Sequence, residues 1–113
     1  MKNKESTRYF SDYHEKSVCE ALGGRQTSNS GANRFEKGDV IVDDILIECK
    51  CAMSEKDSVS IKKDWLLKTK IEAFRNRLSD TCLCFNFEPD GDNYYVIDEK
   101  LMKVLCNALK ESN

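Results

Sequence analysis

One stretch decides the fold: Gly38-Asp39-Val40-Ile41-Val42-Asp43-Asp44-Ile45-Leu46-Ile47-Glu48-Cys49-Lys50. Two apolar, β-branched runs flank an Asp-Asp pair of the kind that fills a tight turn, so the pattern predicts a β-hairpin. Alternate residues of a strand point to the same face, so Glu48 and Lys50 share a face while Cys49 points to the other. The hairpin also returns Asp39 to the side of Glu48. We therefore expect two carboxylates and one ammonium group at one end of a sheet.

These three charges have two interpretations. Buried charges must be paired or coordinated, and a divalent cation together with a phosphodiester would satisfy all three. A hairpin that ends in solvent would instead leave them as ordinary surface charges. The hairpin by itself leaves both interpretations open, so the flanking segments have to be considered.

The segment before the hairpin predicts a helix over residues 7–22. Glu15 lies on its apolar stripe, whereas Glu20 lies on its polar side. A carboxylate on the inward face of a helix needs a partner, which could be a metal ion, a metal-bound water or a lysine. Gly23 and Gly24 then end the helix, because glycine is favoured just after a helix C-terminus.

The loop over residues 25–37 has no apolar periodicity and is rich in hydrogen-bond donors. Loops of this length without structure are usually functional or disordered. Hydroxyl, amide and guanidinium groups are the donors that contact nucleic-acid phosphates. The candidate contacts are Arg25, Ser28, Asn29, Arg34 and Lys37. A solvent loop without a ligand is the alternative.

A second helix is predicted over residues 60–78. We expect its core stripe to consist of Leu67, Ile71, Phe74 and Leu78. Trp65 falls on the opposite side, where an exposed tryptophan would be a candidate subunit contact. Lys62 and Lys63 lie near the helix start, and helix N-termini attract phosphate, so both are further candidate DNA contacts.

The rest of the chain predicts two strands and a last helix. Residues 81–87 and 93–97 have strand periodicity, and a turn separates them. Asp98 is placed to cap a final helix with Leu101 and its i+4 neighbours on one face. We predict a single α/β domain over residues 1–113, in which helices flank a central mixed sheet in the order αβββαβα, with room for extra short strands.

The charge distribution is more informative than the net charge of −2. Residues 1–37 hold seven Lys/Arg and five Asp/Glu, and residues 51–79 hold seven and four, whereas residues 80–113 hold three and seven. A protein that binds the nucleic-acid backbone needs a local positive surface, not a positive total. The basic excess flanks the acidic hairpin, which supports such a surface there.

The six cysteines are expected to be reduced, small apolar residues. None forms the C-x-x-C pair of a zinc site, and the chain has one histidine. No apolar run approaches the length of a membrane span, and no signal peptide is recognisable. We therefore expect a cytoplasmic protein of phage or prokaryotic type, without a membrane partner.

The order of these features resembles the PD-(D/E)XK nuclease superfamily and, within it, the Holliday junction resolvases of the archaeal and phage type. The shared elements are a helix with an early Glu, a small residue followed by Arg, a Ser-Gly loop, a strand that begins with Asp, and a Glu-x-Lys strand. The resemblance covers the chain from about Tyr13 to Phe87, and the last helix carries no motif. The usual proline before the first acid is absent, and Gly38 stands in its place.

The resemblance implies a restriction-endonuclease-like fold and a Mg²⁺-dependent endodeoxyribonuclease in which Mn²⁺ can substitute. Asp39 and Glu48 would hold the metal ion with the backbone carbonyl of Cys49, and Glu15 would act directly or through water. Lys50 would orient or deprotonate the attacking water.

The resemblance also places Ser30 near the site, as the serine of the Ser-Gly loop. It further implies a homodimer that acts in DNA recombination by nicking opposed strands of a four-way junction and leaving 5′-phosphates. Two alternatives stay open. One is a nuclease of the same superfamily for flap, single-stranded or duplex DNA, and the other is a DNA-binding module without catalysis.

Overall fold

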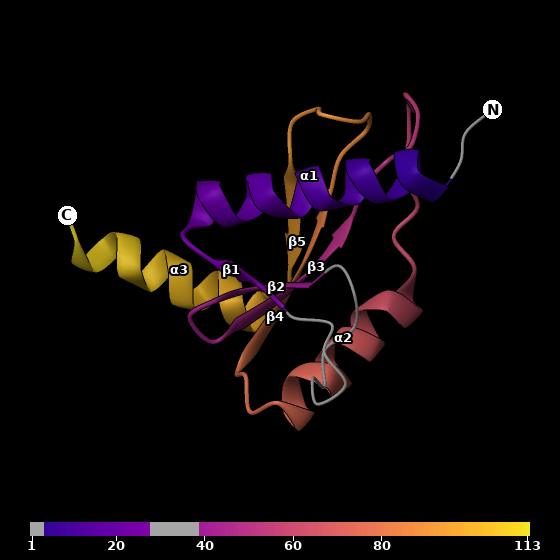
Figure 1. The fold of residues 1–113 in the computed structure, drawn as a ribbon. Coiled ribbons are helices and arrows are strands. Elements are labelled where there is room, and N and C mark those ends of the chain that lie inside the picture. Colours follow the sequence, from indigo (N-terminus) through magenta and orange to yellow (C-terminus); the bar gives the residue numbers. More distant parts are fainter. Residues whose placement is uncertain (1–3, 28–38) are drawn as a thin grey trace.

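The computed structural model describes residues 4–27 and 39–113 (Figure 1). Its elements are α1 (Lys4–Leu22), β1 (Arg25–Gln26), β2 (Asp39–Val42), β3 (Ile45–Lys50), α2 (Lys63–Arg75), β4 (Asp80–Phe85), β5 (Tyr94–Ile97) and α3 (Glu99–Glu111). The α/β class with a mixed sheet flanked by helices is therefore confirmed. The predicted order αβββαβα has one strand between the last two helices where the structure has two, β4 and β5, although both segments were predicted as strands; β1 lies in the segment predicted as a loop.

The five strands form one sheet in the order β1-β2-β3-β4-β5. All neighbouring strands are antiparallel except β3 and β4, which are parallel and are therefore joined by a crossover through α2. The predicted hairpin is confirmed: Asp39 pairs with Glu48, and Val42 pairs with Ile45 across a two-residue turn. Asp43 takes a positive φ of 50° in that turn, a conformation that Asp tolerates better than most residues.

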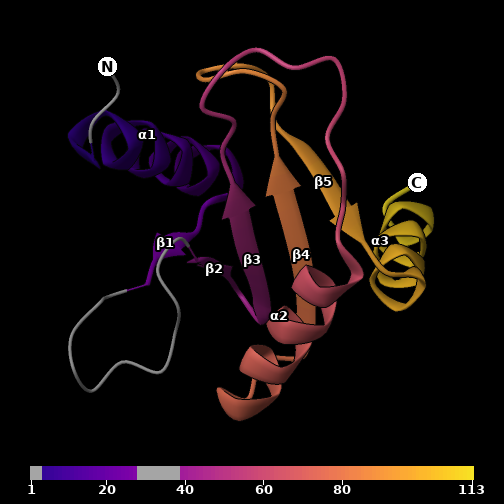
Figure 2. The same cartoon turned by 90° about the vertical axis from the view of Figure 1, so that its right-hand side faces the viewer.

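Helices α1 and α2 pack on opposite faces of the sheet (Figures 1 and 2). Strand alternation separates the side chains of the hairpin into two sets. On the α1 face, Val18 of the helix packs with Val40 and Ile47. On the α2 face, Ala73 of the helix packs with the neighbouring hairpin residues Ile41 and Leu46.

The predicted core stripe of α2 is wrong. Leu67, Ile71 and Phe74 are 48%, 52% and 83% exposed, and the residues that α2 buries are Thr69, Glu72 and Ala73. The helix is also shorter than predicted, and only Leu78, which follows it, packs against the core. A count of apolar residues could not find the inner face, because that face meets the sheet through a small residue and through polar side chains.

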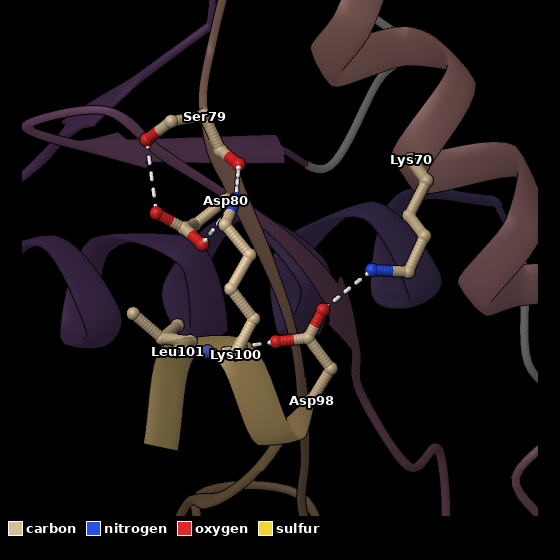
Figure 3. Close-up of polar contacts among 6 residues, drawn as sticks. All are labelled: Lys70, Ser79, Asp80, Asp98, Lys100 and Leu101. Atoms are coloured by element: carbon tan, nitrogen blue, oxygen red, sulfur yellow. Dashed lines mark hydrogen bonds and ion pairs between the residues drawn. The ribbon is translucent and has the colours of Figure 1, made fainter. Parts of the chain in front are cut away.

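Helix α3 is attached to the body by its first turn. The predicted cap is confirmed, since the Asp98 carboxylate accepts a hydrogen bond from the Leu101 amide at 2.9 Å. Ion pairs from Lys70 to Asp98 (2.7 Å) and from Lys100 to Asp80 (3.3 Å) join this turn to α2 and β4 (Figure 3). Leu101 is buried, but the later turns extend past the sheet and leave most of the predicted apolar face exposed (Figure 1).

All six cysteines are free, as predicted, and Cys82 and Cys84 are buried on the α1 face. Among the described residues, no helix is long and apolar enough to cross a membrane.

Candidate active site

The hairpin register places two carboxylates directly opposite each other. Asp39 is the first residue of β2 and is 1% exposed, and Glu48 faces it from β3. Residues that pair directly across antiparallel strands point to the same face, which here is the α2 face. Lys50 lies two residues beyond Glu48 and shares this face, so the predicted convergence of three charged groups is present.

Glu48 is held by two neighbours from different elements. Lys50 Nζ lies 2.8 Å from its Oε2, and Thr69 Oγ1 of α2 lies 2.6 Å from its Oε1. The same hydroxyl lies 2.8 Å from the carbonyl oxygen of Trp65. Because a hydroxyl carries one hydrogen, we assign the donated bond to the charged carboxylate, which is the closer and stronger acceptor.

Trp65 is part of this group and does not face away from the body. Its ring centroid lies 4.5 Å from Lys50 Nζ and 5.6 Å from Lys62 Nζ. Trp65 and Thr69 are four residues apart on α2, so they share one face of the helix. The prediction that Trp65 is exposed is therefore wrong, because α2 turns the side that carries Trp65 towards the sheet.

Glu15 reaches the sheet from the α1 side. It is buried, and Gln26 of the edge strand donates a hydrogen bond to its Oε1 at 3.2 Å. Asp39 and Glu48 point to the α2 side, so these contacts do not bring Glu15 together with them. Within residues 4–27 and 39–113, no three His, Cys, Asp or Glu side chains are grouped to hold a metal ion.

The donor set of Asp39 and Glu48 nevertheless fits Mg²⁺. This ion prefers oxygen ligands, and proteins commonly hold it with one or two carboxylates while it keeps several waters. The Cβ atoms of residues that pair directly across antiparallel strands are about 4.5–5.5 Å apart, so both carboxylates can reach one ion. The carbonyl group of Cys49 follows Glu48 directly and is the third predicted oxygen donor.

The predicted DNA contacts are only partly within the described residues. Ser28, Asn29, Ser30, Arg34 and Lys37 lie outside them. Arg25 is exposed on edge strand β1, where it pairs with Ile41. Lys62 is the N-cap residue of α2 and Lys63 is its first residue, so both are exposed at the predicted helix start.

His14 belongs to a different group, on the α1 face behind the Glu-x-Lys strand. Its Nε2 lies 2.8 Å from Asn93 Oδ1 and 3.6 Å from Cys84 Sγ. Hydrogen bonds from Cys49 and from His14 lower the pKa of Cys84 to about 6. The hydrogen bond between the Cys49 and Cys84 sulfurs raises the pKa of Cys49. These contacts join His14 of α1 to Asn93 and to Cys84 of β4, away from the carboxylate pair.

Sequence analysis missed Thr69 and the position of Trp65 beside Lys50. Neither residue lies on an apolar stripe, so hydrophobic periodicity carried no signal for them. The spacing of four residues between Trp65 and Thr69 did place them on one helix face. That spacing could have identified Trp65 and Thr69 as neighbours of the site only if the face of α2 that meets the sheet had been known.

No protein-family model matches this chain, and searches of the curated proteins and of the solved structures also found no significant match.

Proposed function

We propose that this chain is a metal-dependent DNA endonuclease of the PD-(D/E)XK type. One observation carries the proposal: Asp39 and Glu48 face each other across paired strands, and Lys50 lies on the same face with its ammonium 2.8 Å from Glu48. Carboxylates and a lysine in this arrangement suit phosphodiester hydrolysis, which needs a cation for the phosphate charge and a group to handle the attacking water.

The residues of the chain have separate tasks in this reaction. Asp39 and Glu48 would hold Mg²⁺ with the carbonyl of Cys49, and a bound Mg²⁺ lowers the pKa of a water and neutralises phosphate charge. The Lys50 ammonium, 2.8 Å from Glu48 Oε2, would orient the attacking water and stabilise the developing negative charge. Thr69 fixes the Glu48 carboxylate in place.

The start of α2 supports binding of the phosphate backbone. Lys62 and Lys63 lie at this N-terminus, about two helical turns before Thr69 and its contact with Glu48. Helix N-termini favour anions, and two exposed lysines add to this preference. We propose that the scissile strand passes between Lys50 and Lys62, with Arg25 on the edge of the sheet as a further contact.

The substrate that we propose is a four-way DNA junction, nicked in opposed strands by a homodimer. The support for this finer proposal is the resolvase-like order of elements and the donor-rich loop over residues 25–37. Two copies related by a two-fold axis present two sites to opposed strands.

The test is cleavage of a labelled four-way junction beside duplex, flap and single-strand controls of the same sequence, with Mg²⁺ present. We expect paired nicks in the junction, a dimer by light scattering, and affinity that falls steeply with salt. Cleavage of all substrates alike, or a strict monomer, would remove the junction specificity and leave the nuclease. Binding without cleavage under any divalent cation would contradict the nuclease proposal.

A further inference from the structure

The position of the Lys50 ammonium is set by two contacts of different kinds. On one side Glu48 Oε2 lies 2.8 Å from Nζ, and on the other the ring centroid of Trp65 lies 4.5 Å from it. A lysine side chain is a flexible four-carbon stem, so a single ion pair would leave its ammonium group many positions. An aromatic face adds a second and directional attraction, and tryptophan provides the strongest such face.

One turn of α2 holds both members of this ion pair. Trp65 contacts the ammonium of Lys50, and Thr69, four residues later, contacts the carboxylate of Glu48. Thr69 Oγ1 also lies 2.8 Å from the carbonyl oxygen of Trp65, within the same turn. Because the two contacts belong to one rigid turn, the spacing between carboxylate and ammonium is fixed by the helix.

A second ammonium lies near the same ring. Lys62 Nζ is 5.6 Å from the centroid of Trp65, compared with 4.5 Å for Lys50. Two like charges near one aromatic ring repel each other. An anion that binds Lys62 and moves it from the ring would therefore remove this repulsion from the contact between Lys50 and Trp65. A phosphate of the DNA backbone is an anion that an exposed lysine can bind.

We propose that Trp65 is a positioning residue, whose indole face holds the Lys50 ammonium against Glu48 in the arrangement needed for cleavage. The inference rests on the proposed function, and it names a residue whose side chain has no acid, base or metal-binding group. Trp65 acts through Lys50, whereas Lys62 contributes to the affinity for DNA by binding phosphate.

The first test separates the aromatic face from simple packing. Trp65→Leu keeps an apolar side chain without an aromatic face, and Trp65→Phe keeps a smaller face. We expect kcat to fall about tenfold or more for Trp65→Leu with KM within about twofold, and Trp65→Phe to recover most of the rate. Lys62→Gln should raise KM. Equal rates for the Leu and Phe variants, with both folded, would overturn the inference.

The second test does not depend on cleavage. The chain has one tryptophan, so its fluorescence reports on this ring alone. Lys50→Met should change the emission of Trp65, and in nuclear magnetic resonance spectra the Lys50 Hε protons should be shifted upfield by the ring until Trp65→Leu removes the shift. Lys103→Met is the matched control, because Lys103 pairs with Glu99 on the exposed face of α3.

The two tests distinguish the two proposals. If the wild-type chain cleaves no DNA but the emission and the Hε shift respond as described, the contact between Trp65 and Lys50 stands and the nuclease proposal fails. If the chain cleaves DNA but Lys50→Met leaves the emission unchanged, or no upfield shift is present, the positioning role of Trp65 is overturned while the nuclease stands.

Discussion

Two groups of carboxylates and lysines in this molecule use similar residues for different purposes. The strand-end group consists of Asp39, Glu48 and Lys50 on the hairpin. The cap group consists of Lys70, Asp80, Asp98 and Lys100 at the start of α3 (Figure 3). Both contain two carboxylates and at least one lysine, so composition alone does not tell them apart.

The cap group is explained by the stability of α3. Each carboxylate has its own lysine, and the Asp98 carboxylate also caps the helix. Lys100 additionally donates a hydrogen bond to the carbonyl oxygen of Ser79 at 2.8 Å. The Lys70 and Asp98 side chains are 48% and 37% exposed, as is usual for surface ion pairs that contribute little each.

The strand-end group has a different construction. Its two carboxylates face each other across the hairpin, an arrangement of like charges that does not stabilise a sheet. The Glu48 side chain is 16% exposed, Thr69 of α2 contacts it, and Trp65 of α2 contacts its partner Lys50. The difference teaches that each carboxylate of the cap group is paired with a lysine of its own, whereas the strand-end group brings two carboxylates together beside one lysine, as the proposed chemistry requires.

The largest effect that this comparison predicts is on cleavage. Asp39→Asn and Glu48→Gln should each abolish the nicking of a four-way junction while DNA binding stays within several-fold, because each removes a charge of the proposed metal site and leaves the proposed phosphate contacts. Asp39→Asn should leave the unfolding free energy unchanged or raised, since it relieves the repulsion with Glu48. Gel assays of cleavage and binding, with urea unfolding, measure these effects.

The matched control for this prediction comes from the cap group. Asp80→Asn also neutralises a largely buried carboxylate that is engaged by a lysine. It should leave the cleavage rate unchanged, because it lies at the start of β4 on the side of α3. Unchanged cleavage in Asp39→Asn or Glu48→Gln, or loss of cleavage in Asp80→Asn, would contradict the assignment of the site.

The second prediction concerns the cation. Cleavage should require Mg²⁺ or Mn²⁺, whereas Ca²⁺ should support DNA binding without turnover because its looser coordination positions the water poorly. EDTA should stop the reaction and leave the fold intact. Mg²⁺ should raise the melting temperature of the wild-type chain but not of Asp39→Asn, since only a bound ion stabilises the native state. Cleavage that persists in EDTA would refute this mechanism.

The strand-end group was predictable from the sequence because it is local. The pairing of Asp39 with Glu48 follows from a two-residue turn, and the common face of Glu48 and Lys50 follows from strand alternation. The Asp98 cap was predictable for the same reason, as its partner amide is three residues away. Short-range geometry of this kind leaves few alternatives for the chain.

The orientation of α2 was not predictable, because it depends on contacts far apart in the sequence. Leu67, Ile71 and Phe74 form a regular apolar stripe, and such a stripe usually faces the core. Here Thr69 bonds to Glu48, 21 residues earlier, so the polar face turns inward. Strand β1 was also not predicted, because a two-residue strand is too short to show the alternation of polar and apolar residues that marks a strand.

A smaller effect should follow from the neutral neighbour of Glu48. Thr69→Val removes the hydroxyl that donates to Oε1 and keeps the shape of the side chain, so we expect cleavage to fall about tenfold or more while DNA binding is retained. Thr69→Ser should restore most of the rate. Thr81→Val is the matched control, on the same sheet face in β4. A Thr69→Val enzyme with full activity would mean that Lys50 alone positions the carboxylate.

The smallest effect is expected in the cap group, on stability alone. Asp98→Ala should lower the unfolding free energy by about 1 kcal/mol through loss of the cap, and Asp98→Asn by less, because asparagine also caps helices well. Neither variant should change the cleavage rate.

The hydrogen bond from Lys70 and that from the Leu101 amide lower the pKa of Asp98 below its ordinary value. The contribution of the charge is therefore complete above the unfolded pKa of about 3.9, and it is lost as the pH falls through the lower folded value. Urea unfolding at pH 7 and in acid measures this: the gap between wild type and Asp98→Asn should close as the pH falls below about 4. A gap that stays constant down to acid pH would show that the cap, and not the charge, accounts for the whole effect of Asp98.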